Sequence, residues 1–170
     1  ASLATEALAS LDGTQVNGLA SEDLAAMSST QVAALATDAL ASLDGTQVNG
    51  LASEDLAAMS STQVAALTTE ALASLDGTQV NGLASEDLAA MSSTQVAALA
   101  TDALASLDGT QVNGLASEDL AAMSSTQVAA LTTEALASLD GTQVNGLASE
   151  DIAAMSSTQV AALTTEALAS

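Results

Sequence analysis

The only ionisable side chains in this chain of 170 residues are 21 carboxylates, because it contains no lysine, arginine, histidine, cysteine or tyrosine. Carboxylates can bind calcium through their oxygens, and a pair of them can act as general acid and base in hydrolysis. All 21 fall at position 2, 4 or 5 of a repeated eight-residue motif, as Asp12, Glu22, Asp23 and Asp38 illustrate. What these groups can do therefore depends on how the motif folds.

The eight-residue motif, called the octad, fills residues 3–170 in 21 consecutive copies. Four successive octads read LDGTQVNG, LASEDLAA, MSSTQVAA and LATDALAS, and together they make a 32-residue unit. We therefore expect residues 1–170 to form a single tandem-repeat array, which we interpret as an excerpt of a longer array or filament. The units begin near Leu11, Leu43, Leu75, Leu107 and Leu139.

Apolar residues stand at positions 1 and 6 of each octad, so their spacing alternates between five and three residues. On one continuous helix this stripe would drift by about 80° per octad, which leaves no fixed apolar face. On one strand, odd spacings would place alternate anchors on opposite faces. The chain must therefore bend once in every octad.

Each octad also resembles the start of a helix. Position 2 offers an N-cap such as Asp12 or Ser28, and position 5 offers a capping-box partner such as Gln31. Positions 1 and 6 match the two residues of a hydrophobic staple. In LASEDLAA we expect the cap to move to Ser21. The Asn17-Gly18 pair and its equivalents are expected to make the sharpest turn of each coil, in the left-handed conformation.

The fold class predicted is an all-α solenoid of short capped helices, with one helix per octad and four octads in each 32-residue coil. Positions 1 and 6 are expected to face inward. A β-solenoid is the alternative, because Thr-Gln-Val, Asp-Gly and Asn-Gly can be strand and turn signals. Against it, the alternation of inward and outward residues is missing, and Ala-Leu-Ala is poor strand material.

Helix capping accounts for all the acids, since N-cap, N2 and N3 sites favour carboxylates. The alternative is calcium binding by rows of carboxylates stacked from coil to coil. Against it, the stretch Asp12–Gly18 carries only one carboxylate, whereas a calcium site needs several oxygen ligands. An outward threonine array that binds ice is a third, weaker interpretation. Catalysis would need a base or nucleophile of another type, so we predict no enzyme, no catalytic, cofactor-binding or metal site, and no cofactor.

The net charge of −21 disfavours nucleic acid and anionic membrane surfaces as partners. No apolar run approaches the roughly 20 residues that span a bilayer, so membrane insertion is not expected. The partner predicted is the protein itself, through end-to-end or lateral self-association.

The octads MSSTQVAA and LTTEALAS resemble the Leu-Ser/Thr-x-x-Gln-Val/Ile-Ala-Ala arrays of very large bacterial surface and secreted proteins. This resemblance implies an extracellular or cell-surface location. We therefore predict a structural repeat protein that forms an extracellular filament, stalk or spacer. A calcium-dependent adhesin or binding module is the alternative function.

Overall fold

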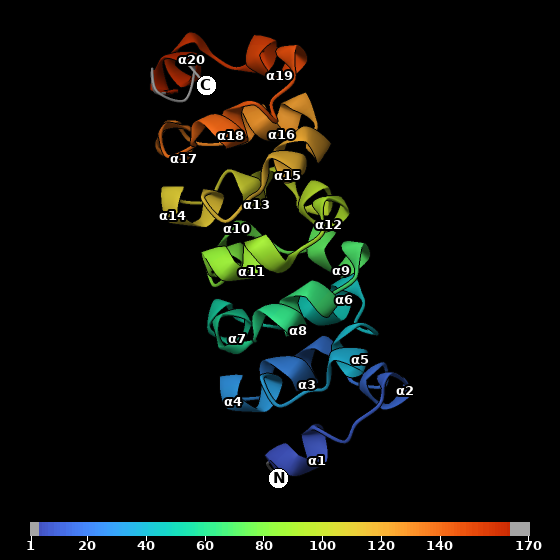
Figure 1. The fold of residues 1–170 in the computed structure, drawn as a ribbon. Coiled ribbons are helices and arrows are strands. Elements are labelled where there is room, and N and C mark those ends of the chain that lie inside the picture. The colour runs from blue at the N-terminus through green and yellow to red at the C-terminus, as the bar shows by residue number, and fades with distance from the viewer. Residues whose placement is uncertain (1–3, 164–170) are drawn as a thin grey trace.

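A computed structural model of the protein describes residues 4–163, which form an elongated stack of short helices with the chain advancing steadily from one end to the other (Figure 1). Each octad contributes one helix, and the described residues contain no strand. The helices are α1 (Thr5–Leu8), α2 (Gly13–Val16), α3 (Ser21–Ala25), α4 (Ser29–Val32), α5 (Thr37–Leu40), α6 (Gly45–Val48), α7 (Ser53–Ala58), α8 (Ser61–Ala66), α9 (Thr69–Ala73), α10 (Gly77–Val80), α11 (Ser85–Ala90), α12 (Ser93–Ala98), α13 (Thr101–Leu104), α14 (Gly109–Val112), α15 (Ser117–Ala122), α16 (Ser125–Ala130), α17 (Thr133–Ala137), α18 (Gly141–Val144), α19 (Ser149–Ala154) and α20 (Ser157–Ala162).

Position 2 is the N-cap of each described helix, as the sequence predicts for the octads other than LASEDLAA. Asp76 has extended backbone dihedrals, and its carboxylate accepts a hydrogen bond from the backbone N–H of Gln79 at 2.9 Å. The Gln79 side chain in turn accepts the N–H of Asp76 at 3.1 Å, which completes a capping box. Such reciprocal bonds satisfy two of the donors that a helix start leaves free.

The cap of LASEDLAA does not move to Ser21, so that prediction is wrong. Ala20 is the N-cap and Ser21 is the first helical residue. The reason is Asp23, whose carboxylate accepts the backbone N–H of Ala20 at 3.0 Å. The acid at position 5 therefore makes half of a capping box without help from a side chain at position 2.

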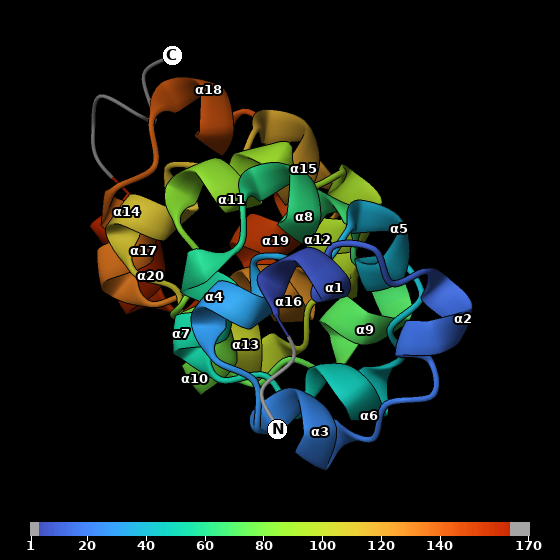
Figure 2. The same cartoon turned by 90° about the horizontal axis from the view of Figure 1, so that it is seen from below.

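Each helix packs on the helix three octads further along the chain, so that α2 lies under α5 and α5 under α8. The same rule holds from α1·α4 to α17·α20. Viewed along the rod, the helices surround its axis (Figure 2). Neighbours above and below supply the burial that a helix of one or two turns cannot supply alone.

The all-α solenoid with one helix per octad is confirmed, but its coil is smaller than the 32-residue unit. Helix–helix contacts join octads three apart, and the hydrogen bonds between coils span 26 to 31 residues. The bend is set by the link, where the N-caps of all octad types have extended backbone, for example Asp44 (φ −90°, ψ 172°) and Ser60 (φ −79°, ψ 154°). Because this geometry is common to all four octad types, the four-octad period describes side-chain chemistry and does not set the size of the coil.

Positions 1 and 6 form one continuous core along the axis, as predicted. Val80 and Leu88 are fully buried and Leu83 is 2% exposed. Burying such a side chain contributes about 1.5–3 kcal/mol. The methionines at position 1 belong to the same core, with Met91 at 5% exposure.

The Asn-Gly corner is not left-handed, which corrects a second prediction. No described residue has a positive φ, and Asn49 has right-handed helical dihedrals (φ −63°, ψ −16°). Glycine is needed here for space, because a Cβ on Gly50 would overlap the backbone carbonyl of Ser21 in the coil below. The corner is a place of close backbone approach between coils.

Candidate functional site: the surface between coils

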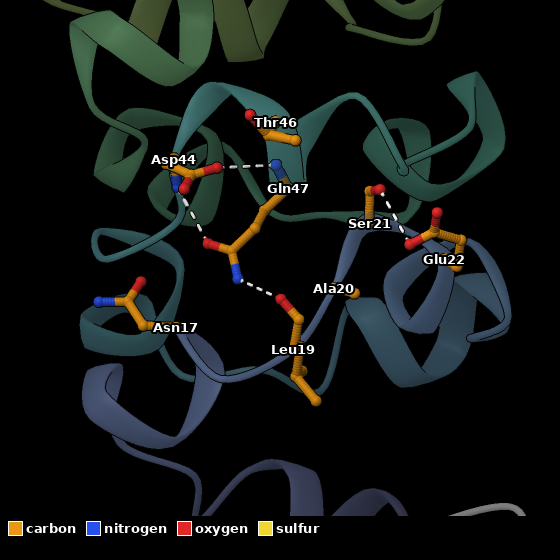
Figure 3. A pocket seen from close by; sticks show the side chains of 8 residues that line it. All are labelled: Asn17, Leu19, Ala20, Ser21, Glu22, Asp44, Thr46 and Gln47. Carbon is orange, nitrogen blue, oxygen red and sulfur yellow. Dashed lines mark hydrogen bonds between the residues drawn. The ribbon is translucent and has the colours of Figure 1, made fainter.

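The position-5 glutamines connect each coil to the coil below it. Gln47 uses its Oε1 to accept the N–H of Asp44, and its Nε2 donates to the carbonyls of Val16 at 2.9 Å and Leu19 at 2.7 Å. Figure 3 shows the amide reaching down from the start of α6 to the link between α2 and α3. One side chain therefore caps its own helix and also hydrogen-bonds to the link in the coil below.

The same pair of donated bonds recurs in all the even-numbered helices from α6 onward, at 2.7–3.0 Å. Several of these amides are nearly inaccessible, with Gln79 at 6% exposure. A buried amide left without partners would cost about 1–3 kcal/mol, so the donated bonds make stacking specific as well as favourable. The donors are Gln47, Gln63, Gln79, Gln95, Gln111, Gln127, Gln143 and Gln159.

The odd-numbered helices carry an acid at position 4, and those of the LASEDLAA octads carry a second acid at position 5; these acids make mostly local bonds. Asp87 is 5% exposed, and its carboxylate accepts the N–H of Ala84 at 2.8 Å. A carboxylate has no proton to donate to a carbonyl below. The acids can only accept from another coil, as Asp119 does from the Ser93 hydroxyl at 2.7 Å.

Octads with an acid at position 4 do not stack on one another. Because each helix packs on the one three octads away, an odd-numbered helix always meets even-numbered ones. Position 4 therefore alternates along each stack of helices between threonine, such as Thr46, and a carboxylate, such as Glu70 in the next helix up. The calcium alternative depends on stacked rows of like carboxylates, and this alternation interrupts such rows at position 4.

The acids singled out from the sequence occupy the start of their helices. Asp12 is an N-cap whose carboxylate accepts the N–H of Gln15 at 2.9 Å, Glu22 and Asp38 lie in first turns, and Asp23 is at N3. Among residues 4–163, no group of three or more acids gathers in a way that could hold a metal ion. These acids therefore lie at helix starts, where their hydrogen bonds cap the helix.

Among residues 4–163, one acid has a shifted pKa. The pKa of Glu118 lies below its usual value because its carboxylate accepts hydrogen bonds from its own backbone N–H and from the Ser117 hydroxyl, the latter at 3.0 Å. The group is fully exposed, which is the opposite of the buried setting expected for a catalytic acid.

A hollow of about 440 Å³ lies beside the first of the connecting glutamines (Figure 3). It opens between the corner that follows α2 and the start of α6. Some of its polar groups bond to one another, as in the Ser21 hydroxyl that donates to Glu22 at 3.3 Å. The lining residues are Asn17, Leu19, Ala20, Ser21, Glu22, Asp44, Thr46 and Gln47.

The alternation of alanine and threonine at position 2 of the LATDALAS-type octads also affects stacking. Thr68 caps α9 by accepting the N–H of Ala71 at 3.1 Å, and Ser74 at the end of that octad donates to the Gly45 carbonyl in the coil below at 3.1 Å. Ala36 offers no cap, and the equivalent Ser42 bonds within its own helix. The second and fourth units therefore have an extra bond between coils.

Two groups of residues at this surface were not identified from the sequence. The position-5 glutamines were predicted as caps, but their second role depends on carbonyls 28–31 residues away, which no local pattern reveals. The glycines were assigned to left-handed turns. The recurrence of Gln at every second octad, where Asp or Ala could also fit a helix start, was the one available signal.

No helix in the described part of the chain is both long and apolar enough to cross a membrane.

The fold and its contact surface define a tandem-repeat solenoid, in which identical surfaces stack along one axis. The family model of the ALTTAQ repeat matches residues 49–85, 80–117 and 113–149, which together cover more than half of the chain. The protein therefore belongs to the ALTTAQ repeat family. The matches begin about one 32-residue unit apart, in agreement with the period of the sequence. No curated protein matches the chain.

Proposed function

We propose that this protein is a structural rod, forming an extracellular filament, stalk or spacer without catalytic activity. The observation that carries the proposal is the repetition of one contact surface along the molecule, from α1·α4 to α17·α20. A solenoid of this kind gains length with each added unit while its cross-section stays the same. The resemblance of the octads to arrays in large bacterial surface proteins supports the extracellular location.

End-to-end association with a second copy is part of the proposal. The anchors of the first and last coils, such as Leu19 and Leu147, are only partly buried, whereas Leu83 in the middle is 2% exposed. Throughout the rod each helix rests on the helix three octads before it. A second copy can therefore repeat contacts that the interior already makes.

Electron microscopy of the purified chain at increasing concentration tests the mechanical role. We expect rods of constant diameter that lengthen in steps of one molecule. Compact particles of constant size at all concentrations would contradict end-to-end association. Antibody labelling of intact cells, with permeabilised cells as the control, tests the location, since an extracellular rod is labelled on both.

The calcium-dependent alternative makes a different prediction for stability. A ligand that binds only the folded state raises the melting temperature with its concentration. We expect the same melting temperature in calcium and in magnesium at equal ionic strength, because both ions only screen the repulsion between carboxylates. A rise specific to calcium, reversed by a chelator, would favour the alternative function.

A further inference from the structure

The methionines are the side chains of this protein that a peroxide oxidises readily. There are five of them, and the sequence contains no cysteine, tryptophan, tyrosine or histidine. They are spaced 32 residues apart, and each is position 1 of an MSSTQVAA octad. Oxidation converts this flexible apolar side chain into a polar sulfoxide. The five are Met27, Met59, Met91, Met123 and Met155.

At position 1 the methionines are less covered than the leucines. Along the interior of the rod, Met59, Met91 and Met123 are each 5% exposed, whereas the position-1 leucines from Leu43 to Leu139 are 1–2% exposed. Methionines and leucines belong to the same apolar cluster. A small oxidant can therefore reach these thioethers with less local opening of the coils than the leucine positions would need.

The coil above each interior methionine presents an acid where Leu51 and its equivalents have a glutamine. Gln79 donates to the carbonyl of Leu51, 28 residues earlier, at 2.7 Å. At the same offset from Met59 stands Asp87, whose carboxylate has no proton to donate and accepts the N–H of Ala84. The equivalent pairs are Met91 with Asp119 and Met123 with Asp151.

The helix pair at Met59 depends on apolar packing. The octad that begins with Met59 contains α8, and α11 packs on α8 in the coil above (Figure 1). Both helices are fully described, and no hydrogen bond joins one to the other. The contact between these two helices is therefore sensitive to the polarity of the side chain at position 1.

A sulfoxide at Met59 would lack a hydrogen-bond donor. Its oxygen accepts hydrogen bonds, and the carboxylate that the coil above contributes, that of Asp87, can only accept as well. The buried side chains of the surrounding cluster are apolar. A polar group that is buried without a partner disfavours the folded state. Oxidation should therefore weaken the packing of α11 on α8.

We propose that the position-1 methionines are oxidation sites at which a peroxide loosens the stacking of the coils. The sulfur attacks one oxygen of hydrogen peroxide with a lone pair and the O–O bond breaks. The proton of the transferred hydroxyl leaves with the other oxygen as water, so the thioether is oxidised and the peroxide is reduced. Enzymatic reduction can return the sulfoxide to the thioether, which makes the loosening reversible. This inference goes beyond the structural role proposed above and does not depend on it, since it concerns contacts within one molecule.

Treatment of the intact chain with hydrogen peroxide tests the proposal. The control is a variant in which all five methionines are replaced by leucine, the residue at position 1 of the other three octad types. Mass spectrometry counts the oxygen atoms gained, and circular dichroism gives the melting temperature. We expect oxidation to lower the melting temperature of the unaltered chain by about 5 °C or more and to leave that of the variant unchanged.

Three results would overturn the proposal. Methionines that stay unoxidised in the folded chain, at a peroxide concentration that oxidises them in urea, would show that the stack excludes the oxidant. An oxidised chain with an unchanged melting temperature would show that the fold accommodates the sulfoxides. An equal fall in the chain and in the leucine variant would place the damage elsewhere. The structural role proposed above would stand in each case, because rod formation is measured without oxidant.

Single replacements separate the polarity of position 1 from the oxidant. Met91→Gln introduces a polar side chain of similar length and should lower the melting temperature without peroxide, whereas Met91→Leu should not. If both variants melt at the same temperature, a polar group at this position does not loosen the stack. Reduction of the oxidised chain by methionine sulfoxide reductases should restore its original melting temperature. A melting temperature that stays low after mass spectrometry shows complete reduction would mean that the sulfoxides were not the cause.

Discussion

The even-numbered and odd-numbered helices perform different tasks with the same octad. An even-numbered helix sends a glutamine amide to two carbonyls of the coil below, as Gln79 does with Val48 and Leu51. The Asp87 carboxylate of the next helix accepts the N–H of Ala84 instead. Hydrogen-bonded connection between coils is thus mainly carried by alternate helices, while the acids serve their own helix starts. The two classes meet in every stacked helix pair, and the glutamine bonds are directed from the even-numbered helix to the coil below it.

Replacing an apolar residue at position 1, which helices of both classes have, should cause the largest loss of stability. Leu83 is 2% exposed, and its carbonyl accepts the Gln111 amide at 2.7 Å. Leu83→Asp buries an unpaired charge and should destabilise the chain by about 4 kcal/mol or more in urea unfolding. The neighbouring Ala84→Asp is the control, since Ala84 is an exposed N-cap at which aspartate is favoured. Equal losses in the two variants would refute the inward placement of position 1.

Removing the donor from one even-numbered helix should cost less. Gln79→Glu keeps an oxygen for the N–H of Asp76 but turns a carboxylate towards two carbonyls, and should lower the free energy of unfolding by about 2 kcal/mol. Gln15→Glu is the matched control. Gln15 also accepts the N–H of its cap, and no described residue accepts a bond from its Nε2. If both variants lose the same stability, the bonds between coils contribute nothing.

Giving an odd-numbered helix a side-chain amide that can donate to the coil below tests whether the difference between the two classes lies in that donor. Asp87→Gln places an amide at the same offsets, 28 and 31 residues, from the carbonyls of Met59 and Leu56. It also removes a buried charge, so we expect stabilisation of about 1 kcal/mol. Asp23→Gln removes a charge from the exposed equivalent in the first coil and controls for the change in net charge. A loss of stability specific to Asp87→Gln would mean that odd-numbered helices require the acid.

A smaller difference separates two octads of the odd-numbered class. Thr68→Ala removes a cap and should cost about 1 kcal/mol, measured by thermal unfolding. Ala36→Thr supplies the missing cap and should raise the stability by a similar or smaller amount. If Ala36→Thr gives no gain, then capping alone does not distinguish the alternate units.

The smallest effect concerns the one shifted acid. Ser117→Ala removes a hydrogen bond to the Glu118 carboxylate, so its pKa should rise towards the usual value in an NMR titration. Because the pKa is lowered by folding, this group stabilises the fold above its ordinary pKa, and the contribution fades as the pH falls through the lowered value. In the variant, the loss of folding stability between the ordinary pKa and the lowered pKa should be smaller. An unchanged pKa would assign the shift to the backbone N–H alone.

Local features of the fold were predictable because they depend on neighbours within one octad. The inward Leu83 and Val80 and the N-cap Asp76 follow from spacing and capping chemistry. The size of the coil was not predictable in the same way. It results from small bends that accumulate over several links, and the four-octad period of the sequence suggested a larger coil than the backbone makes.

The contact surface was predictable only in part. A glutamine at position 5 fits a capping box, and that interpretation uses its oxygen and leaves its Nε2 unassigned. The acceptors of that Nε2 are identified only once the number of octads per turn is known, as for Gln79 and the carbonyl of Leu51. The same holds for Gly50, whose small size matters because of Ser21 in another coil.

The offset between a contact every three octads and a sequence that repeats every four constrains how such a gene can change in length. Duplicating or deleting a whole 32-residue unit leaves the type of every stacked neighbour unaltered. Inserting a single octad would shift the pattern. Across the insertion, helices with an acid at position 4 would pack on one another, and helices with a glutamine at position 5 would pack on one another. Recombination between units is therefore neutral for the fold, whereas slippage by one octad is not. The nearly identical units are what such a restriction on length variation would leave behind.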